Sequence, residues 1–466
     1  MRPAERFLSD EQLVQTLFFV VLALFASSVP AQSDTWYHLR SGLEMWRTRA
    51  PLVTEPFSYT AHGAPLGNHW WLSQLLFYAV YAIGGAKGLS VFLGGCAFAA
   101  VAVSYRLTRK GNYSDVILLP LLILATAPAW SARPQLISLL LLALTAHLVV
   151  ADRVRWLPLL CVVWANAHAL VIFGVAVAAV TAIEALVVSR AYARRDVAMA
   201  ILCALSPTIS PLGWQYWPRV LATVSVSKAL EVSEYRPPFA PTDFPFWILT
   251  ALLAWLTLAQ RHTFVSRPRT DRLLVATAWV LWLAAATAAR NVAFFAIIGV
   301  PAVARLLHAQ APVSARPPRP AGWPAFVLVA LLMAFGSTVV VTRWRNNGVA
   351  IGWVPMSTAL IQAVRTCPDP IFNTMWDGGS LMWAVPERRV FIDGRMEAYP
   401  LELLRRSQQA DVNGDYITLF RDYHIRCAIV RVPSRLHEQL TNDTSMTLTY
   451  SDRDHAVYRS VDFAIP

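Results

Sequence analysis

Long apolar stretches separated by short polar connections dominate the first 342 residues of the chain. Eleven stretches are long enough, or nearly so, to cross a bilayer, whose hydrocarbon core requires about 20 apolar helical residues. They run at 13–30, 88–106, 115–129, 134–151, 155–167, 168–188, 197–212, 245–260, 273–289, 291–308 and 323–342. The pattern predicts an α-helical polytopic membrane protein with about 11 transmembrane helices.

Two polar segments interrupt this pattern. Residues 31–71 are rich in Trp, Tyr, His and acidic residues, and the tail covers residues 343–466. In the tail, β-rich runs alternate with helical ones, which predicts a small α/β domain. The β-rich runs are 370–373, 389–392, 427–432, 447–450 and 456–459, and the helical runs are 401–409 and 416–423. We therefore expect a transmembrane domain over 1–342, with 31–71 as its first outer loop, and a separate domain over 343–466.

Composition and charge agree with a membrane protein. The chain is 56% hydrophobic and 15% charged, with a mean hydropathy of +0.45, whereas soluble domains are about 25% charged. The net charge is +12, but the tail from Arg343 onward has 14 basic and 14 acidic residues. The whole excess therefore lies in the connections between apolar stretches, which argues against nucleic-acid binding and points to membrane edges.

The distribution of Lys and Arg predicts the orientation of the chain. Alternate connections form two sets: seventeen basic residues lie in one set of short loops, and nine are spread through the longer loops of the other. Short loops rich in Lys and Arg stay in the cytoplasm. With eleven spans, this places the N-terminus inside and the tail outside.

No pattern indicates a metal or nucleotide site. Three of the five cysteines lie in apolar stretches, and Cys367 and Cys427 in the tail have neither a CxxC motif nor a spacing to histidine suited to zinc. The chain also lacks a P-loop and a dinucleotide-binding glycine pattern. We expect no cofactor and no structural metal.

The first outer loop carries the strongest candidates for catalysis. Asp34 and His38 are four residues apart, so on a helix they share a face. A partly desolvated carboxylate just above the membrane, oriented by a nearby His or Arg, can act as a general base. The alternative is that Asp34 only caps the helix. Arg40, on the same segment, is a candidate for binding the substrate.

Two further residues of this loop are candidates. Glu55 precedes Pro56 and is therefore expected in an extended segment, as a second catalytic carboxylate or as a solvated turn residue. His69 is a candidate for binding the substrate, or it helps Asn68 to cap a helix that begins at Trp70 and lies near the outer interface.

Other polar residues should reach the same outer face. Arg133 and Arg290 each begin a span that enters from outside, where a lipid phosphate matches the fork of a guanidinium; snorkelling to headgroups is the alternative. His168 and Glu234 are expected on this face as well. Charged residues at mid-span are nearly absent, and Glu184 lies near a predicted inner end, which argues against an ion-coupled transporter.

Several short motifs, in this order and with this sidedness, resemble a bacterial family within the C-type (GT-C) superfamily of membrane glycosyltransferases. They are Asp-x-Trp-Tyr-His-Leu at 34–39, Pro-Phe-Ser-Tyr-Thr at 56–60, His69 with Trp-Leu-Ser-Gln at 71–74, Arg-Pro-Gln at 133–135, Asn166 with His168, Pro-Leu-Gly-Trp at 211–214, Glu234-Tyr235, Arg290-Asn291, Gly378-Gly379 and Val-Phe-Ile-Asp-Gly-Arg at 390–395.

The resemblance implies enzymes of the bacterial cytoplasmic (inner) membrane that use polyprenyl-phosphate-linked sugars. It also implies an acidic catalytic residue in the first outer loop, here Asp34, and a lipid-phosphate pocket lined by basic residues. The chain departs from the family at Glu55, where relatives often carry Asp, and it lacks an acid beside His69. These departures argue against a two-carboxylate or metal site.

We therefore predict transfer of a sugar, with inversion, from a polyprenyl-phosphate donor to an acceptor outside the cytoplasm. The alternatives are a transferase of the O-antigen ligase or polymerase type, a lipid or glycan transporter, and a membrane scaffold without enzymatic activity. In the tail, Asp377-Gly378-Gly379 and Asp393-Gly394-Arg395 could contact donor or acceptor, or form tight turns beside strands.

Overall fold

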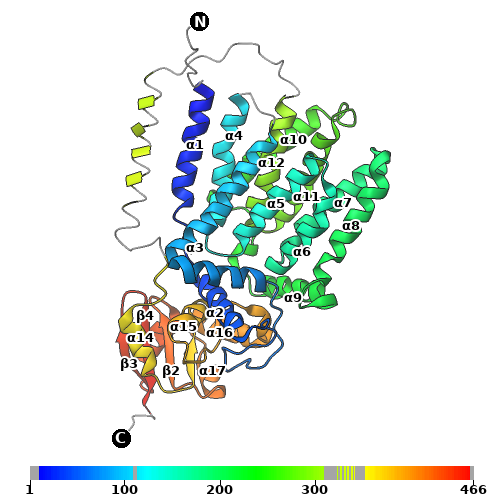
Figure 1. The fold of residues 1–466 in the computed structure, drawn as a ribbon. Coiled ribbons are helices and arrows are strands. Elements are labelled where there is room, and N and C mark those ends of the chain that lie inside the picture. Colours follow the sequence, from blue (N-terminus) through cyan, green and yellow to red (C-terminus); the bar gives the residue numbers. More distant parts are fainter. Residues whose placement is uncertain are drawn as a thin grey trace. The chain divides into compact units, whose positions relative to one another are not determined.

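The computed structural model describes residues 10–108, 113–308 and 352–461, with isolated positions between 323 and 341. The chain forms two compact units, each built from several stretches (Figure 1). The helical unit contains Met1–Pro30, Gly84–Ser210 and Ser233–Ala350; the sheet unit contains Ala31–Ile83, Pro211–Val232 and Ile351–Pro466. Residues of the first outer loop thus belong to the same unit as the tail, whereas the sequence assigned this loop to the transmembrane domain.

Helices that lie side by side form the helical unit (Figure 1). They are α1 (Asp10–Ala26), the second half of α3 (Trp71–Leu107), α4 (Tyr113–Thr126), α5 (Gln135–Val150), α6 (Leu157–Ala167), α7 (Val171–Val187), α8 (Ala193–Leu205), α10 (Phe244–Ala259), α11 (Arg269–Thr287) and α12 (Val292–His308). Helix α3 is broken at Gly85, whose backbone has φ +60° and ψ −158°, and the chain passes there from one unit to the other. Every residue of α12 from Val292 to Leu306 is buried, which makes α12 the central helix of this unit.

Each of the first ten predicted spans contains one of these helices, but the prediction of 11 transmembrane helices is not confirmed. Among the described residues, three helices are long and apolar enough to cross a membrane alone: Trp71–Leu107, Pro241–Ala259 and Ala289–His308. Others, such as Val171–Val187, are apolar but shorter. The eleventh predicted span, 323–342, lies almost entirely outside the described residues.

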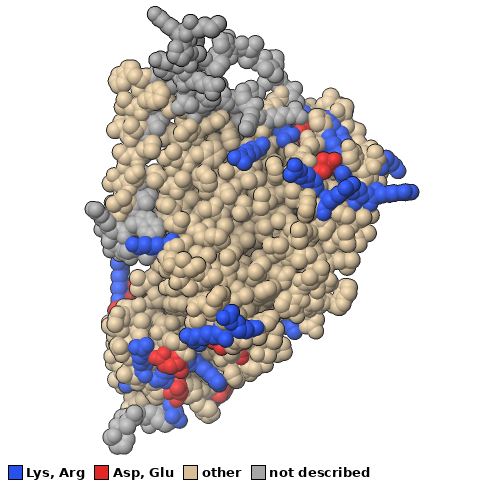
Figure 2. All heavy atoms as spheres, in the orientation of Figure 1, with Lys and Arg blue, Asp and Glu red and all other residues tan. Residues whose placement is uncertain are grey.

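Charged residues are nearly absent from the side of the helical unit visible in Figure 2 and gather at one of its ends. At the connections of α7, α8 and α11, Arg269 donates to Glu184 at 2.7 Å and pairs with the buried Asp196. Arg272 donates to the other oxygen of Glu184 at 2.5 Å. Glu184 therefore does not snorkel to the surface, because two guanidiniums neutralise it where it is buried.

The sheet unit is a small α/β domain, as the tail sequence predicts. Its four strands have the order β1-β2-β4-β3, with β1 parallel to β2 and the other pairs antiparallel. The strands are β1 (Ile371–Asn373), β2 (Cys427–Arg431), β3 (Met446–Ser451) and β4 (His455–Ser460), and the helices are α2 (Ser33–Thr48), the first half of α3, α9 (Tyr216–Ala229), α14 (Thr358–Arg365), α15 (Met375–Ala384), α16 (Leu401–Asn413), α17 (Ile417–Asp422) and α18 (Arg435–Asn442). Four of the five predicted strands are therefore present.

Alternation of side chains gives this sheet two buried faces. Phe372 and Val430 belong to one core cluster with residues of α16, α17 and α18, whereas Ile371 and Ile429 belong to a second cluster with residues of α14 and α15. The fifth predicted strand, 389–392, forms only an isolated bridge between Val390 and Ser58. The segment is not a strand of the sheet, because the backbone with which Val390 pairs belongs to the first outer loop and not to another strand.

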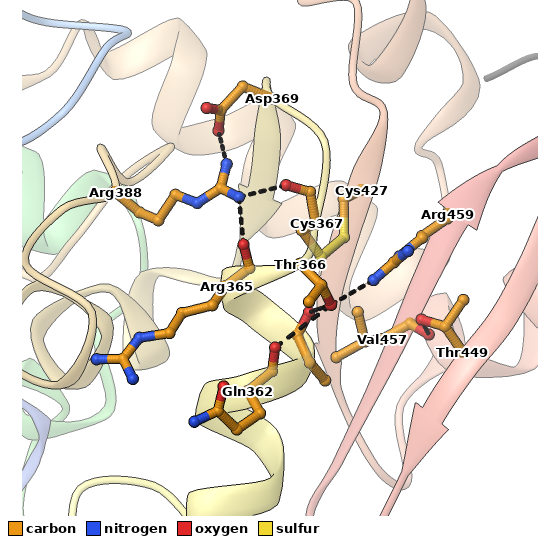
Figure 3. The surroundings of a disulfide bond; sticks show 11 residues. Gln362, Arg365, Thr366, Cys367, Asp369, Arg388, Cys427, Thr449, Val457 and Arg459 are labelled. Carbon is orange, nitrogen blue, oxygen red and sulfur yellow. Dashed lines mark hydrogen bonds and ion pairs between the residues drawn. A yellow bond between two sulfur atoms is a disulfide. The ribbon is translucent and has the colours of Figure 1, made fainter. Parts of the chain in front are cut away.

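A disulfide joins Cys367, just after α14, to Cys427 in β2 (Figure 3). Nearby, Arg388 forms an ion pair with Asp369 at 2.8 Å and donates to the carbonyl oxygen of Cys367 at 2.5 Å. The sequence excluded a zinc site for these cysteines but did not predict that they pair. The sheet unit thus contains a covalent cross-link across 60 residues of sequence.

Candidate functional site

Asp34 lies in the first turn of α2 and is half-buried. The N-cap is Gln32, whose backbone N–H donates to the hydroxyl of Thr35 at 3.0 Å. Asp34 is therefore not the residue that caps this helix. Its Oδ1 atom faces Gly394 of the tail, where a β-carbon on that glycine would lie only 2.9 Å away. The carboxylate of the first outer loop thus lies against the tail.

The two other candidates on α2 are more enclosed. His38 is 2% exposed, with its Nδ1 atom 3.3 Å from Nε2 of Gln74 and its ring against those of Trp70 and Phe77. Arg40 is 3.7 Å from Glu44, and burial lowers the pKa of its guanidinium although Glu44 opposes this. His38 shares the helix with Asp34, as predicted, in an aromatic environment.

Glu55 is fully buried in an ion cluster, which excludes the alternative of a solvated turn residue. Its Oε1 atom accepts from the backbone N–H groups of Phe57 and Ser58 at 2.7 and 2.8 Å, and its Oε2 atom lies 2.6 Å from Nη1 of Arg395. Burial raises the pKa of Glu55, while Arg395 opposes the increase. Glu55 thus links the first outer loop to Arg395 of the tail, and a catalytic role for it stays a prediction.

The same guanidinium is held on its other side by Asp393. Arg395 donates through Nε and Nη2 to the two oxygens of Asp393 at 2.8 and 2.6 Å, and Tyr399 donates to Oδ2 at 2.6 Å. Asp393 and Arg395 are both buried. Sequence reasoning named this Asp-Gly-Arg motif but missed its role, because its partner Glu55 is more than 300 residues away in the sequence.

Both candidate histidines outside α2 are buried and hydrogen-bonded. The Nδ1 atom of His69 is 3.0 Å from the carbonyl oxygen of Gly67. In the helical unit, Nδ1 of His168 is 2.9 Å from the hydroxyl of Ser138, which also accepts from Nε1 of Trp164 at 2.8 Å. These contacts orient each ring within its own unit.

Arg133, Glu234 and Arg290 converge in the helical unit. Nη1 and Nη2 of Arg133 donate to the two carboxylate oxygens of Glu234 at 2.5 and 2.9 Å, and Nη1 of Arg290 is 3.6 Å from the second oxygen. Gln135 accepts from Arg133 at 3.2 Å and donates to the backbone carbonyl of Arg290 at 3.4 Å. The result is an ion cluster in which one carboxylate meets two guanidiniums. We call Arg133 and Arg290 the arginine pair, and Glu234 is the carboxylate that they share.

Asp377, the other tail acid singled out in the sequence, is buried and paired. Its Oδ1 atom is 3.1 Å from Nη2 of Arg431 and 3.3 Å from Nε2 of His455, and Thr374 donates to Oδ2 at 2.8 Å. Residues Gly378 and Gly379 lie inside α15, so the alternative of a tight turn is wrong for this motif. Asp377 thus holds parts of the sheet unit together through its contacts with Arg431, His455 and Thr374.

The ion pair between Asp377 and His455 predicts a pH dependence of stability. Burial lowers the pKa of His455, but the hydrogen bond and charge of Asp377 outweigh burial, so this pKa is raised above its ordinary value of 6.5. Burial raises the pKa of Asp377, but His455 and Arg431 outweigh burial, so this pKa is lowered below its ordinary value of 3.8. The His455 contribution is therefore complete below pH 6.5 and is lost as the pH rises through the folded-state pKa. Thermal unfolding between pH 6 and 9 should show this loss, and His455→Gln should reduce it; equal slopes in both proteins would contradict the assignment.

The candidates therefore form two groups, Asp34 with its neighbours in the sheet unit and the arginine pair in the helical unit. Among the described residues, no three His, Cys, Asp or Glu side chains are placed to hold a metal ion.

Comparison with solved structures gives the class of this fold. The chain is similar to the archaeal oligosaccharyltransferase AglB from Archaeoglobus fulgidus, solved in complex with an inhibitory peptide and a dolichol-phosphate, with a TM-score of 0.58 and 12% identity over 96% of this chain and 74% of that one. It is also similar to ArnT from Cupriavidus metallidurans in the apo state, with a TM-score of 0.53 and 13% identity over 95% of this chain and 96% of ArnT. No family model and no curated protein sequence matches the chain. The chain therefore shares the fold of AglB and ArnT over almost its whole length, which agrees with the resemblance that its motifs indicated.

Proposed function

We propose that the protein transfers a sugar from a polyprenyl-phosphate-linked donor to an acceptor on the extracytoplasmic side of the membrane. The observation that carries the proposal is the likeness of fold, over almost the whole chain, to a transferase solved with dolichol-phosphate. Two features of this chain support it independently: a half-buried carboxylate in the first outer loop, and a pair of guanidiniums gathered around one anion.

The chemistry assigns a role to each group. Asp34 takes the proton of the acceptor hydroxyl as its oxygen attacks the anomeric carbon. The bond from that carbon to the phosphate oxygen breaks, the configuration inverts, and polyprenyl phosphate leaves. Arg133 and Arg290 stabilise the negative charge that develops on the leaving phosphate. The step requires no nucleotide.

The extracytoplasmic location has two supports. Lys and Arg are concentrated in the set of loops on the opposite side from the tail, and the sheet unit contains the Cys367–Cys427 disulfide. Disulfides persist in the bacterial periplasm and are rare in the cytoplasm.

Glu234 has a particular place in this proposal. Its carboxylate occupies the position where a phosphate would bind the arginine pair. The side chain is 35% exposed, so a phosphate can compete with it from solvent. Replacement by glutamine removes the charge and weakens this internal competitor. We therefore expect Glu234→Gln to bind undecaprenyl phosphate about fivefold to tenfold more tightly, a change of about 1 kcal/mol.

Binding of undecaprenyl phosphate in detergent micelles, followed by native mass spectrometry, measures this effect. Glu231→Gln is the matched control, because it removes the same charge from an exposed residue nearby in the sequence. Arg133→Gln should weaken binding. Unchanged or weaker binding by Glu234→Gln would contradict the role given to this carboxylate.

The function itself is tested by reconstitution. The purified protein in vesicles is given a panel of undecaprenyl-phosphate hexoses and pentoses and, in parallel reactions, undecaprenyl-diphosphate glycans, with an envelope extract as the source of acceptor. We expect release of free undecaprenyl phosphate from at least one donor, dependent on the extract. Release only from undecaprenyl-diphosphate glycans would favour a ligase or polymerase, and lipid movement without release would favour a transporter.

A further inference from the structure

The first turn of α2 meets the tail at two glycines. A β-carbon at Gly379, inside α15, would lie 2.4 Å from the carbonyl oxygen of Ser33. A β-carbon at Gly394 would lie 2.9 Å from Oδ1 of Asp34 and 3.1 Å from the ring of Tyr37. Both short distances are below those that β-carbons adopt in proteins, so a larger residue at either position must displace α2 or its side chains.

The backbone that presents Gly394 is fixed from three directions. Its neighbours Asp393 and Arg395 are buried in the ion cluster with Glu55. On the third side, a β-carbon at Gly378 would lie 2.1 Å from the carbonyl oxygen of Ile392, so α15 packs directly against this segment. Gly394 therefore cannot move away from the carboxylate of Asp34 without disrupting buried ion pairs.

From this geometry we propose that Gly379 and Gly394 are positioning residues that set the place of the Asp34 carboxylate, so that the tail domain takes part in catalysis by orienting the base. The inference rests on the proposed function, in which Asp34 accepts the proton. It gives the Asp-Gly-Gly and Asp-Gly-Arg motifs one purpose, close approach to α2. A glycine pair inside a helix is otherwise unfavourable, because glycine has low helix propensity.

Gly394→Ala is the informative variant. The atoms that its methyl group would meet are the ends of two side chains, Asp34 and Tyr37, which can rotate without unfolding the unit. The carboxylate should therefore move while the protein folds. Because a displacement of about 1 Å can lower a rate about 100-fold, we expect kcat to fall by about 10-fold to 100-fold, with the donor KM within about threefold of wild type.

Two readouts separate positioning from a general loss of stability. The acid limb of the pH profile of kcat should shift in Gly394→Ala, because the environment of the base changes. Gly394→Ala should also cost little further activity when added to Asp34→Asn, since both changes act on one group. Both are measured with the undecaprenyl-phosphate donor that the wild type uses in the panel.

Gly414→Ala is the matched control. Gly414 ends α16 with a left-handed φ of +84°, and its β-carbon would meet the flexible side chain of Gln439, not α2. This variant should lower the unfolding temperature but leave kcat per folded molecule unchanged. A kcat for Gly394→Ala within twofold of wild type, or an equal loss in Gly414→Ala, would overturn the inference.

The outcomes also separate this inference from the proposed function. Absence of donor turnover by the wild type would overturn the proposed function. Full activity of Asp34→Asn would exclude Asp34 as the base and the inference with it, whereas an inactive Asp34→Asn with a fully active Gly394→Ala would overturn only the positioning role. If Gly394→Ala does not accumulate, the double variant Gly394→Ala/Tyr37→Leu replaces it. In this variant the added methyl group no longer meets the ring of Tyr37 but still meets the carboxylate of Asp34. That double variant, compared with Tyr37→Leu alone, gives the same decision.

Discussion

Asp34→Asn should lower the turnover of the lipid-linked donor by about 100-fold to 10,000-fold, with normal abundance in the membrane. Asparagine keeps the shape of the side chain but cannot accept the proton of the acceptor. Since Gln32, and not Asp34, caps α2, the substitution should leave the helix intact. The measurement is release of undecaprenyl phosphate by the purified variant, with its quantity fixed by immunoblot.

Glu44→Gln provides the control for this prediction. Glu44 lies on the same helix and its replacement removes the same charge, but its ion pair with Arg40 is long at 3.7 Å. We expect the activity of this variant to remain within about twofold of wild type, as for surface ion pairs in general. Full activity of Asp34→Asn at normal expression would exclude Asp34 as the base.

Arg395→Met should strongly destabilise the sheet unit. The substitution leaves the carboxylates of Glu55 and Asp393, both 0% exposed, without the cation that lies between them. Removal of one partner from a buried ion pair costs about 3–5 kcal/mol. For a unit of this size, about 1 kcal/mol corresponds to 2–4 °C, so the unfolding temperature should fall by about 6–20 °C.

Thermal unfolding and limited proteolysis of the purified protein measure this loss. Arg435→Met is the matched control, because Arg435 is 69% exposed and pairs with Glu438 on the surface of α18. Its unfolding temperature should change by at most about 2 °C. An unchanged unfolding temperature in Arg395→Met would mean that the buried cluster does not anchor the first outer loop.

The sequence predicted local structure well, because local structure depends on neighbouring residues. Ten apolar stretches contain helices, and the β-rich runs of the tail identified strands such as Cys427–Arg431. The number of membrane crossings did not follow, since helices such as α6 and α7 are short and the length of an apolar stretch does not show how the chain crosses. Helix α15 was missed because its two central glycines are typical of turns.

The arrangement of the candidate residues could be predicted only in part, for the same reason. The four-residue spacing of Asp34 and His38 and the position of basic residues at helix starts could be read from the sequence. The structure brings Arg133, Arg290 and Glu234 together. The burial of Glu55 could not be read, because it depends on Arg395, a partner from the far end of the chain. The motif around Arg395 was visible, but only the folded unit shows what it contacts.

In the function proposed for this protein, the arginine pair binds the phosphate of the donor and Asp34 accepts the proton of the acceptor. An experimental structure with undecaprenyl phosphate bound tests this most directly. We predict a phosphate within hydrogen-bonding distance of Arg133 and Arg290, with Glu234 displaced and the Asp34 carboxylate facing the position of the transferred sugar. A phosphate bound away from both arginines, or an Asp34 carboxylate that faces away from it, would contradict the proposal.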